Sequence, residues 1–292
     1  MILNVCQEKF MDVLIGWVDG APMLVLGSAV LVLMALAVAT GVMIKRQHLR
    51  DRRGKDDGVG DGESYMVSGV LGLLALLMGF TFALAVDRFE TRRMLVMQEA
   101  NAIGTTYLRT QLLDEPHRAR ISGLLVDYAE NRVALGKSNV ARNPQLLVKN
   151  DRLVTELWAA TASAFQTIKG LDFSSAYLES MNTLIDLDAS RKAARLVRVP
   201  TEVFVVLVIY VIVTAGVLGY VFVGKRGRSA AAVMLFMLSM SLLLIVDIDR
   251  PTGGGVREGQ GPMERLVESF KATPGSAYDR FRIQDAGPAA SP

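Results

Sequence analysis

The chain has 292 residues, of which 51% are hydrophobic and 21% are charged, and its formal net charge is +3. This composition is too apolar for a soluble protein of this length and is typical of a membrane protein. Basic and acidic residues are interleaved outside the apolar stretches, which argues against nucleic acid as a partner. Cys6 is the only cysteine, so an intramolecular disulfide and a cysteine-rich metal site are excluded.

Residues 1–20 contain Glu8 and Asp12 and lack a basic leader, so they do not resemble a cleavable signal peptide. Phe10 and Leu14 would share one side of a helix, which suits a short segment lying at the membrane interface. A frayed end fits this stretch equally well.

Three uncharged stretches are long enough to cross a hydrocarbon core of about 30 Å as helices, at about 1.5 Å per residue, and a fourth is slightly short but is bounded by charge on both sides, as a span would be. They cover residues 21–44, 66–86, 203–223 and 230–246. Each stretch is continuously apolar and does not alternate every second residue, so helices are predicted and barrel strands are not. We therefore expect an all-α integral membrane protein with four transmembrane helices.

These spans divide the chain into five predicted parts. In chain order they are an interfacial segment (1–20), two spans joined by a basic loop at 45–65 (21–86), a helical extramembrane bundle (87–202), two further spans (203–246) and a Gly/Pro-rich tail (247–292). The short loops at 45–65 and 224–229 are rich in Lys and Arg, which predicts that they face the cytoplasm of a bacterial inner membrane and that the bundle faces the periplasm. Arginines also flank the bundle, so the opposite orientation stays open.

The bundle is predicted to be helical throughout. Span two continues past Asp87 to about Leu113 with helical spacing of its apolar residues. A second helix has Pro116 in its first turn, a third opens at Asn143, and a fourth starts near Asp172. In the tail, only residues 263–271 show a helical pattern.

No motif predicts catalysis. The "GKS" at 136–138 lacks the earlier glycine and the preceding strand of a phosphate loop, and the acidic stretch at 56–63 does not match a calcium loop. His48 and His117 have no partner at metal-ligand spacing. We expect no enzyme activity, no cofactor and no bound metal.

Span two repeats small residues four apart, as at Ser68 and Gly72. The simplest interpretation is close packing of helices in lipid. A sharper hypothesis is a homo-oligomer in which Met78, Phe82 and Val86, each one turn apart, form stacked apolar rings at a pore neck, because apolar constrictions gate by dewetting.

Beyond this span, Arg88, Arg92 and Glu99 fall close to one line along the predicted helix. Arg88 and Arg92 would then form a pore mouth whose positive field concentrates small anions. The alternative is that Glu99 pairs with an arginine from another helix of the bundle.

Two stretches resemble a known family. "GFTFALAVDRFETRRMLVMQEANAIGT" and "DIDRPTGGG" resemble the two signature blocks of a bacterial multi-pass membrane family of unknown function that is called bestrophin-like. The matching positions are Gly79, Phe80, Thr81, Phe82, Arg92, Arg93, Glu99, Asn101, Gly104, Asp247, Asp249, Arg250 and Pro251.

The resemblance implies an architecture and a function. Bestrophins are pentameric anion channels whose second span forms an apolar neck and whose helices continue into a soluble domain. Met78, Phe82 and Val86 match the spacing of that neck and not its residue types. Bestrophins keep the helical domain and both termini in the cytosol, opposite to the orientation that the basic loops predict.

We therefore expect a homo-oligomeric membrane channel for anions or small solutes. The alternative is a non-transporting membrane scaffold or sensor whose helical bundle binds a partner or ligand.

Overall fold

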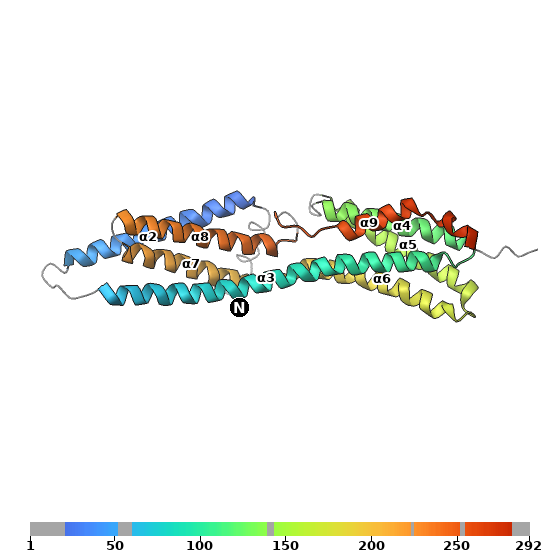
Figure 1. The fold of residues 1–292 in the computed structure, drawn as a ribbon, viewed down its shortest axis with the longest axis horizontal. Coiled ribbons are helices and arrows are strands. Elements are labelled where there is room, and N and C mark those ends of the chain that lie inside the picture. The colour runs from blue at the N-terminus through green and yellow to red at the C-terminus, as the bar shows by residue number, and fades with distance from the viewer. Residues whose placement is uncertain (1–20, 52–59, 139–142, 223–224, 252–254, 282–292) are drawn as a thin grey trace, which may run out of the picture. The chain divides into compact units, whose positions relative to one another are not determined.

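The structure is a computed structural model that describes residues 21–51, 60–138, 143–222, 225–251 and 255–281 (Figure 1). Over these ranges the protein consists of helices and short connections, and it contains no strand. The all-α prediction is therefore confirmed. The interfacial helix predicted within residues 1–20 lies outside the described residues.

The chain folds as two compact units. The membrane unit comprises Met1–Phe89 and Val197–Arg257, and the bundle unit comprises Glu90–Leu196 and Glu258–Pro292. Helix α3, Gly60–Thr110, contributes residues to both units without a break in its helical hydrogen bonding. The predicted continuation of span two beyond Asp87 is thus confirmed.

The membrane unit contains α2 (Met23–Asp51), the first part of α3, α7 (Thr201–Val221) and α8 (Lys225–Asp249). Four helical segments of the described chain are long and apolar enough to cross a bilayer: Met23–His48, Tyr65–Thr110, Phe173–Val221 and Arg226–Asp249. Many large apolar side chains on these helices are exposed, as expected for a surface that faces lipid.

Glycines hold α2 and α7 close together in the membrane unit. A Cβ built on Gly41 would lie 2.1 Å from the carbonyl oxygen of Gly216, and one built on Gly219 would lie 2.3 Å from that of Val38. Only residues without a side chain permit this approach, which increases van der Waals contact between helices in lipid. The buried apolar core of the unit includes Met34, Leu74, Met78, Ala85, Leu207, Val211, Ala215, Leu242 and Ile245.

The bundle unit contains the end of α3 with α4 (His117–Lys137), α5 (Gln145–Ile168), α6 (Phe173–Leu196), α9 (Gly261–Ala272) and a 3-10 helix (Gly275–Phe281). Its core includes Ile103, Tyr107, Ile121, Leu125, Tyr128, Leu157, Tyr177, Met181, Leu184, Met263 and Phe270. Burial of this apolar surface is the main force that holds the helices together.

Helix starts in the bundle agree with the prediction. Pro116 directly precedes α4 instead of lying in its first turn, and α5 begins just after Asn143 and Pro144. Proline suits this position because the first N–H groups of a helix have no intrahelical partner.

The loop predicted at 45–65 is shorter in the structure, because helices extend into it from both ends. The last turns of α2 continue to Asp51, where Lys, Arg, Gln and Leu favour helix, and α3 already begins at Gly60. The helix predicted at 263–271 of the tail is confirmed as α9, which buries Met263, Val267 and Phe270 in the core of the bundle unit.

Candidate functional site

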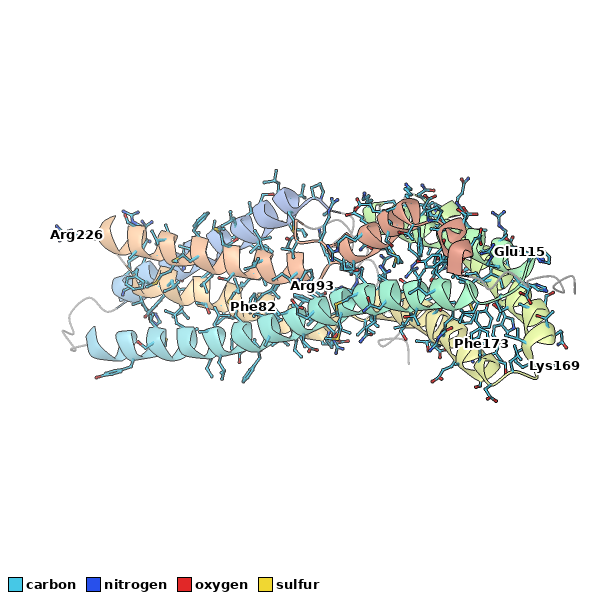
Figure 2. The ribbon with its side chains drawn as sticks, turned by 45° about the vertical axis from the view of Figure 1, so that its right-hand side comes forward. Phe82, Arg93, Glu115, Lys169, Phe173 and Arg226 are labelled. Carbon is cyan, nitrogen blue, oxygen red and sulfur yellow. The ribbon has the colours of Figure 1, made fainter. Side chains whose placement is uncertain are left out.

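The three residues predicted to form a pore neck do not share one exposed face of α3. Met78 is buried in the core of the membrane unit, and Val86 is half-buried against the same core. Phe82 is 41% exposed and lies midway along α3 (Figure 2). Of the three, Phe82 alone is open to another subunit or to a pore.

The exposed face of α3 carries small and large apolar residues together. A Cβ built on Gly69, Gly72 or Gly79 would meet no other described atom within 4 Å. Leu73, Leu76 and Phe80 on this part of α3 are each more than half exposed. Gly69, Gly72, Leu73, Leu76 and Phe80 are three or four residues apart along α3, so they lie on one face that the described chain leaves uncovered.

The two residues predicted to form a pore mouth differ in their surroundings. Arg92 is 2% exposed, and its Nε lies 3.0 Å from Glu258 Oε1 in the bundle unit. Arg88 is half-buried, and the neighbouring Asp87 and Glu90 are exposed. The structure therefore places Arg92 in a buried ion pair, because the chain segment before α9 supplies a carboxylate there.

Glu99 is the centre of a buried network of ion pairs in the bundle unit. The side chain is fully buried, and its carboxylate contacts Arg191 of α6 and Arg132 of α4, whose Nε lies 3.0 Å away. The hydroxyl of Tyr128 donates a hydrogen bond to the same carboxylate. Pairing of Glu99 with arginines from other helices is thus confirmed.

Asp188 of α6 extends the network. Arg132 Nη1 lies 3.3 Å from Asp188 Oδ1, and Asn150 donates a hydrogen bond of 2.8 Å to the same oxygen. Lys192 connects Asp188 to Asp151 at the surface, through contacts of 2.5 and 2.6 Å. Two buried carboxylates therefore face two buried guanidinium groups, which offsets the cost of removing these charges from water.

Burial and charge both act on Tyr128. Removal from water raises the pKa of Tyr128 well above its ordinary value, and the negative charge of Glu99 raises that pKa further. Burial opposes the charged form of Arg132, but the attraction of Glu99, Tyr128 and Asp188 together outweighs it and raises the Arg132 pKa. Tyr128 is consequently a neutral hydrogen-bond donor and Arg132 a permanent cation.

Tyr128→Phe removes a donor shared by two buried carboxylates, Glu99 and Asp188. We expect a loss of about 1–3 kcal/mol in the stability of the bundle unit at neutral pH, because a buried hydrogen bond to a charged group is lost while the carboxylates keep their other partners. Urea unfolding followed by the fluorescence of Trp158, in a Trp17→Phe background, measures this loss.

The stability that Tyr128 contributes to the bundle unit should decrease at high pH. Because the folded-state pKa of Tyr128 is raised, its contribution is fully present below the ordinary tyrosine value of about 10 and is lost as the pH rises through the folded-state pKa. The difference between wild type and Tyr128→Phe should therefore be constant up to about pH 9 and shrink above about pH 10. Tyr65→Phe, at an exposed tyrosine of the membrane unit, is the control; a difference that stays constant above pH 10 would contradict the assignment.

The second signature block organises the membrane unit. Asp247 accepts hydrogen bonds from the N–H groups of Gly255 and Val256, at 2.7 and 2.9 Å. Asp249 accepts one of 3.0 Å from Val199 N–H just before α7. Arg250 donates one of 3.1 Å to the carbonyl oxygen of Ala21. These contacts fix the chain where helices of the unit end and begin.

The other signature residues differ in role. Gly104 lies beside α9, where a Cβ would come within 3.3 Å of Leu266. Thr81 is buried and its hydroxyl donates to the carbonyl oxygen of Leu77, whereas Arg93 pairs with Glu90 at the surface. Asn101 lies on the exposed side of α3, and Pro251 is half-buried at the end of α8.

Tyr128, Arg132 and Asp188 were not predicted as members of the site. Tyr128 and Arg132 are four residues apart on α4 and so share one face, a spacing that is visible in the sequence. Their partners come from α3 and α6, which no local pattern identifies. Among the described residues, no group of three or more His, Cys, Asp or Glu side chains is arranged to hold a metal ion.

Four apolar helices long enough to span a bilayer, with a helical bundle whose apolar core encloses buried ion pairs, define a multi-pass helical membrane protein. The chain belongs to the Bestrophin-like family, whose domain model matches residues 31–257. No curated protein matches the sequence.

Solved structures show the same fold. A crystal structure of a substituted bacterial bestrophin homolog from Klebsiella pneumoniae is similar with a TM-score of 0.63 at 16% identity, covering 84% of this chain and 95% of that chain. A second variant of that homolog is similar with a TM-score of 0.61 at 16% identity, covering 83% of this chain and 96% of that chain. A crystal structure of a substituted membrane protein is similar with a TM-score of 0.62 at 15% identity, covering 85% of this chain and 98% of that chain.

Proposed function

We propose that copies of this chain assemble around the exposed face of α3 and form a channel for small anions. The observation that carries the proposal is that face itself, where glycines have no neighbour within the described chain and large apolar residues are exposed. Four spans are too few to enclose a wide path, so a pore requires several copies related by symmetry. Membership of the Bestrophin-like family supports the same arrangement.

The proposed pore has an apolar constriction. Phe82 is the exposed member of the predicted neck, and a ring of such side chains in an oligomer would exclude water from a narrow path until it opens. Met78 lies behind it in the core and would support the helix. Exposed charges of both signs lie just beyond the span, at Asp87, Glu90 and Arg93, so local charge alone does not select anions. The preference for anions is inferred from the resemblance to bestrophins.

Phe82→Ala should change the rate of anion efflux from liposomes that contain the purified full-length protein. Removing the ring widens and wets the constriction, so we expect efflux about tenfold or more above that of wild type, the equivalent of about 1.4 kcal/mol in the barrier. Chloride efflux is measured with an ion-selective electrode after the potential across the liposome membrane is collapsed.

Phe236→Ala is the matched control, because Phe236 is also an exposed phenylalanine of a span but lies on α8. Its efflux should equal that of wild type. Equal rates for wild type, Phe82→Ala and Phe236→Ala would remove Phe82 from the neck. Absence of efflux from protein that is folded but monomeric in detergent would instead favour the scaffold or sensor alternative.

A further inference from the structure

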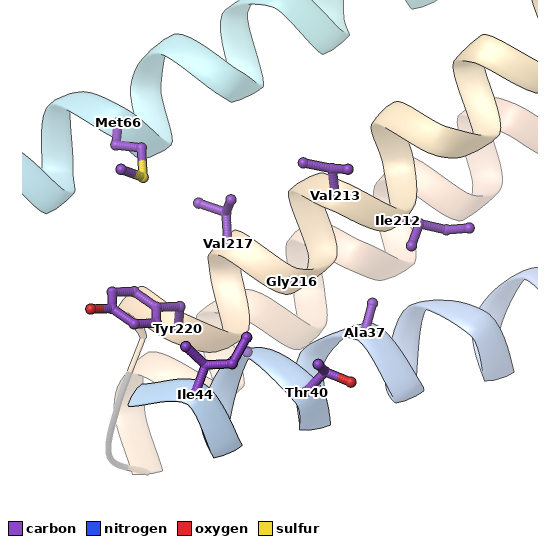
Figure 3. Close-up of a pocket in the computed structure, with 10 residues that line it drawn as sticks. Ala37, Thr40, Ile44, Met66, Ile212, Val213, Gly216, Val217 and Tyr220 are labelled. Carbon is purple, nitrogen blue, oxygen red and sulfur yellow. The ribbon is translucent and has the colours of Figure 1, made fainter. Parts of the chain in front are cut away.

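A groove opens on the surface of the membrane unit between α2, α7 and the start of α3 (Figure 3). Its volume is about 430 Å³, within the range of about 300–1,000 Å³ that is usual for small-ligand sites. Ala37, Thr40 and Ile44 line it from α2, and Met66 lines it from α3. The remaining wall comes from α7, where Val213, Val217 and Tyr220 are prominent in the close-up.

The groove exists because its floor lacks side chains. Gly41 and Gly216 both line it, and the close approach of their backbones leaves no room for a Cβ at Gly41. Apart from the hydroxyl groups of Thr40 and Tyr220, the side chains that line the groove are apolar. It lies on helices that are long and apolar enough to span a bilayer, so its natural occupant is a hydrocarbon chain of the bilayer.

One end of the groove is cationic. The ammonium group of Lys45 lies 5.2 Å from the ring centroid of Tyr220, and the His48 ring packs edge-on against the same tyrosine at 6.2 Å. Arg46 and Arg50 on the same last turns of α2 are exposed. Over its last turns α2 carries Lys45, Arg46 and Arg50 against one acidic residue, the terminal Asp51, so this end of the helix has a net positive charge.

We propose that the groove binds an anionic phospholipid, with an acyl chain between α2 and α7 and the phosphate beside Lys45 and Arg46. Apolar lining accounts for the chain, and the cations at the Tyr220 end account for the negative headgroup. Each Lys or Arg near an anionic lipid surface contributes about 1 kcal/mol. A zwitterionic lipid with the same acyl chains fits the groove but lacks this attraction.

The test is native mass spectrometry of the purified full-length protein with phosphatidylglycerol or phosphatidylcholine of identical acyl chains. Phosphatidylglycerol should bind more tightly. Lys45→Gln should lower the preference about fivefold, which is about 1 kcal/mol converted at 1.4 kcal/mol per factor of ten. Lys169→Gln, at an exposed lysine just after α5 in the bundle unit, should leave the preference unchanged.

A second variant tests the hydrocarbon half of the site. Val217→Trp fills the groove and should weaken binding of both lipids, whereas Val206→Trp, on the same helix outside the groove, should not. Equal affinity of wild type for the two lipids would overturn the proposal. It would also be overturned if wild type bound no lipid while Val217→Trp changed the oligomeric mass, because a second copy of the chain would then occupy the groove.

Discussion

Glu99→Gln should unfold or strongly loosen the bundle unit. Glu99 is fully buried, and its carboxylate contacts both Arg132 and Arg191, whose side chains are also almost fully buried. Removal of this negative charge leaves Arg132 with Asp188 as its carboxylate partner and leaves Arg191 with the neutral side chain of Gln260. Breaking a buried pair by removing one partner costs about 3–5 kcal/mol, a large part of the stability of an ordinary domain.

Hydrogen exchange measured by mass spectrometry resolves this effect by segment. Peptides of α4, α5 and α6 should lose protection in Glu99→Gln, because their exchange depends on opening of the bundle unit. Glu90→Gln on the same helix is the control: Glu90 is exposed and lies 3.4 Å from exposed Arg93, so its removal should cost less than about 1 kcal/mol. Equal protection in the two variants would show that the network does not hold the bundle together.

Gly41→Ala should destabilise the membrane unit. The new methyl group would lie 2.1 Å from the carbonyl oxygen of Gly216 and 2.9 Å from the backbone nitrogen of Tyr220. Backbone atoms cannot rotate away as a side chain can, so α2 and α7 must separate. Overpacking of this kind costs about 1–3 kcal/mol, although alanine itself favours helix.

Thermal unfolding in detergent, followed by circular dichroism, measures this loss. Gly219→Ala should behave similarly, since its methyl group would meet the backbone of Val38 at 2.3 Å. Gly69→Ala is the control, because a methyl group on Gly69 meets no described atom within 4 Å and gains helix propensity. A midpoint for Gly41→Ala equal to that of Gly69→Ala would contradict the close approach of α2 and α7.

Most of the helical architecture follows from local patterns. Pro116 and Pro144 mark helix starts because proline fixes a helical φ and needs no N–H partner there, and the four spans follow from apolar length. The role of α9 was also accessible, since Met263, Val267 and Phe270 repeat at helical spacing. Its place in the bundle core was not, because no local pattern says which helices meet.

The candidate site shows the limit of such patterns more clearly. Helical spacing puts Arg88 and Arg92 near one line, but only the tertiary fold brings Glu258 to Arg92. The sequence predicts that an arginine from another helix pairs with Glu99, but it does not identify which one. Arg132 and Arg191 are 33 and 92 residues away in the chain. In the same way, Met78 and Phe82 are one turn apart, and the packing of α3 within the membrane unit buries the first and exposes the second.

The most direct test of the proposed function is the reversal potential of the current that purified protein carries across a planar lipid bilayer under a potassium chloride gradient. An anion channel formed by copies of this chain predicts a current whose reversal potential lies close to the chloride equilibrium potential. A reversal potential close to that of potassium would contradict the anion preference, and the absence of any current from oligomeric protein would contradict the channel itself.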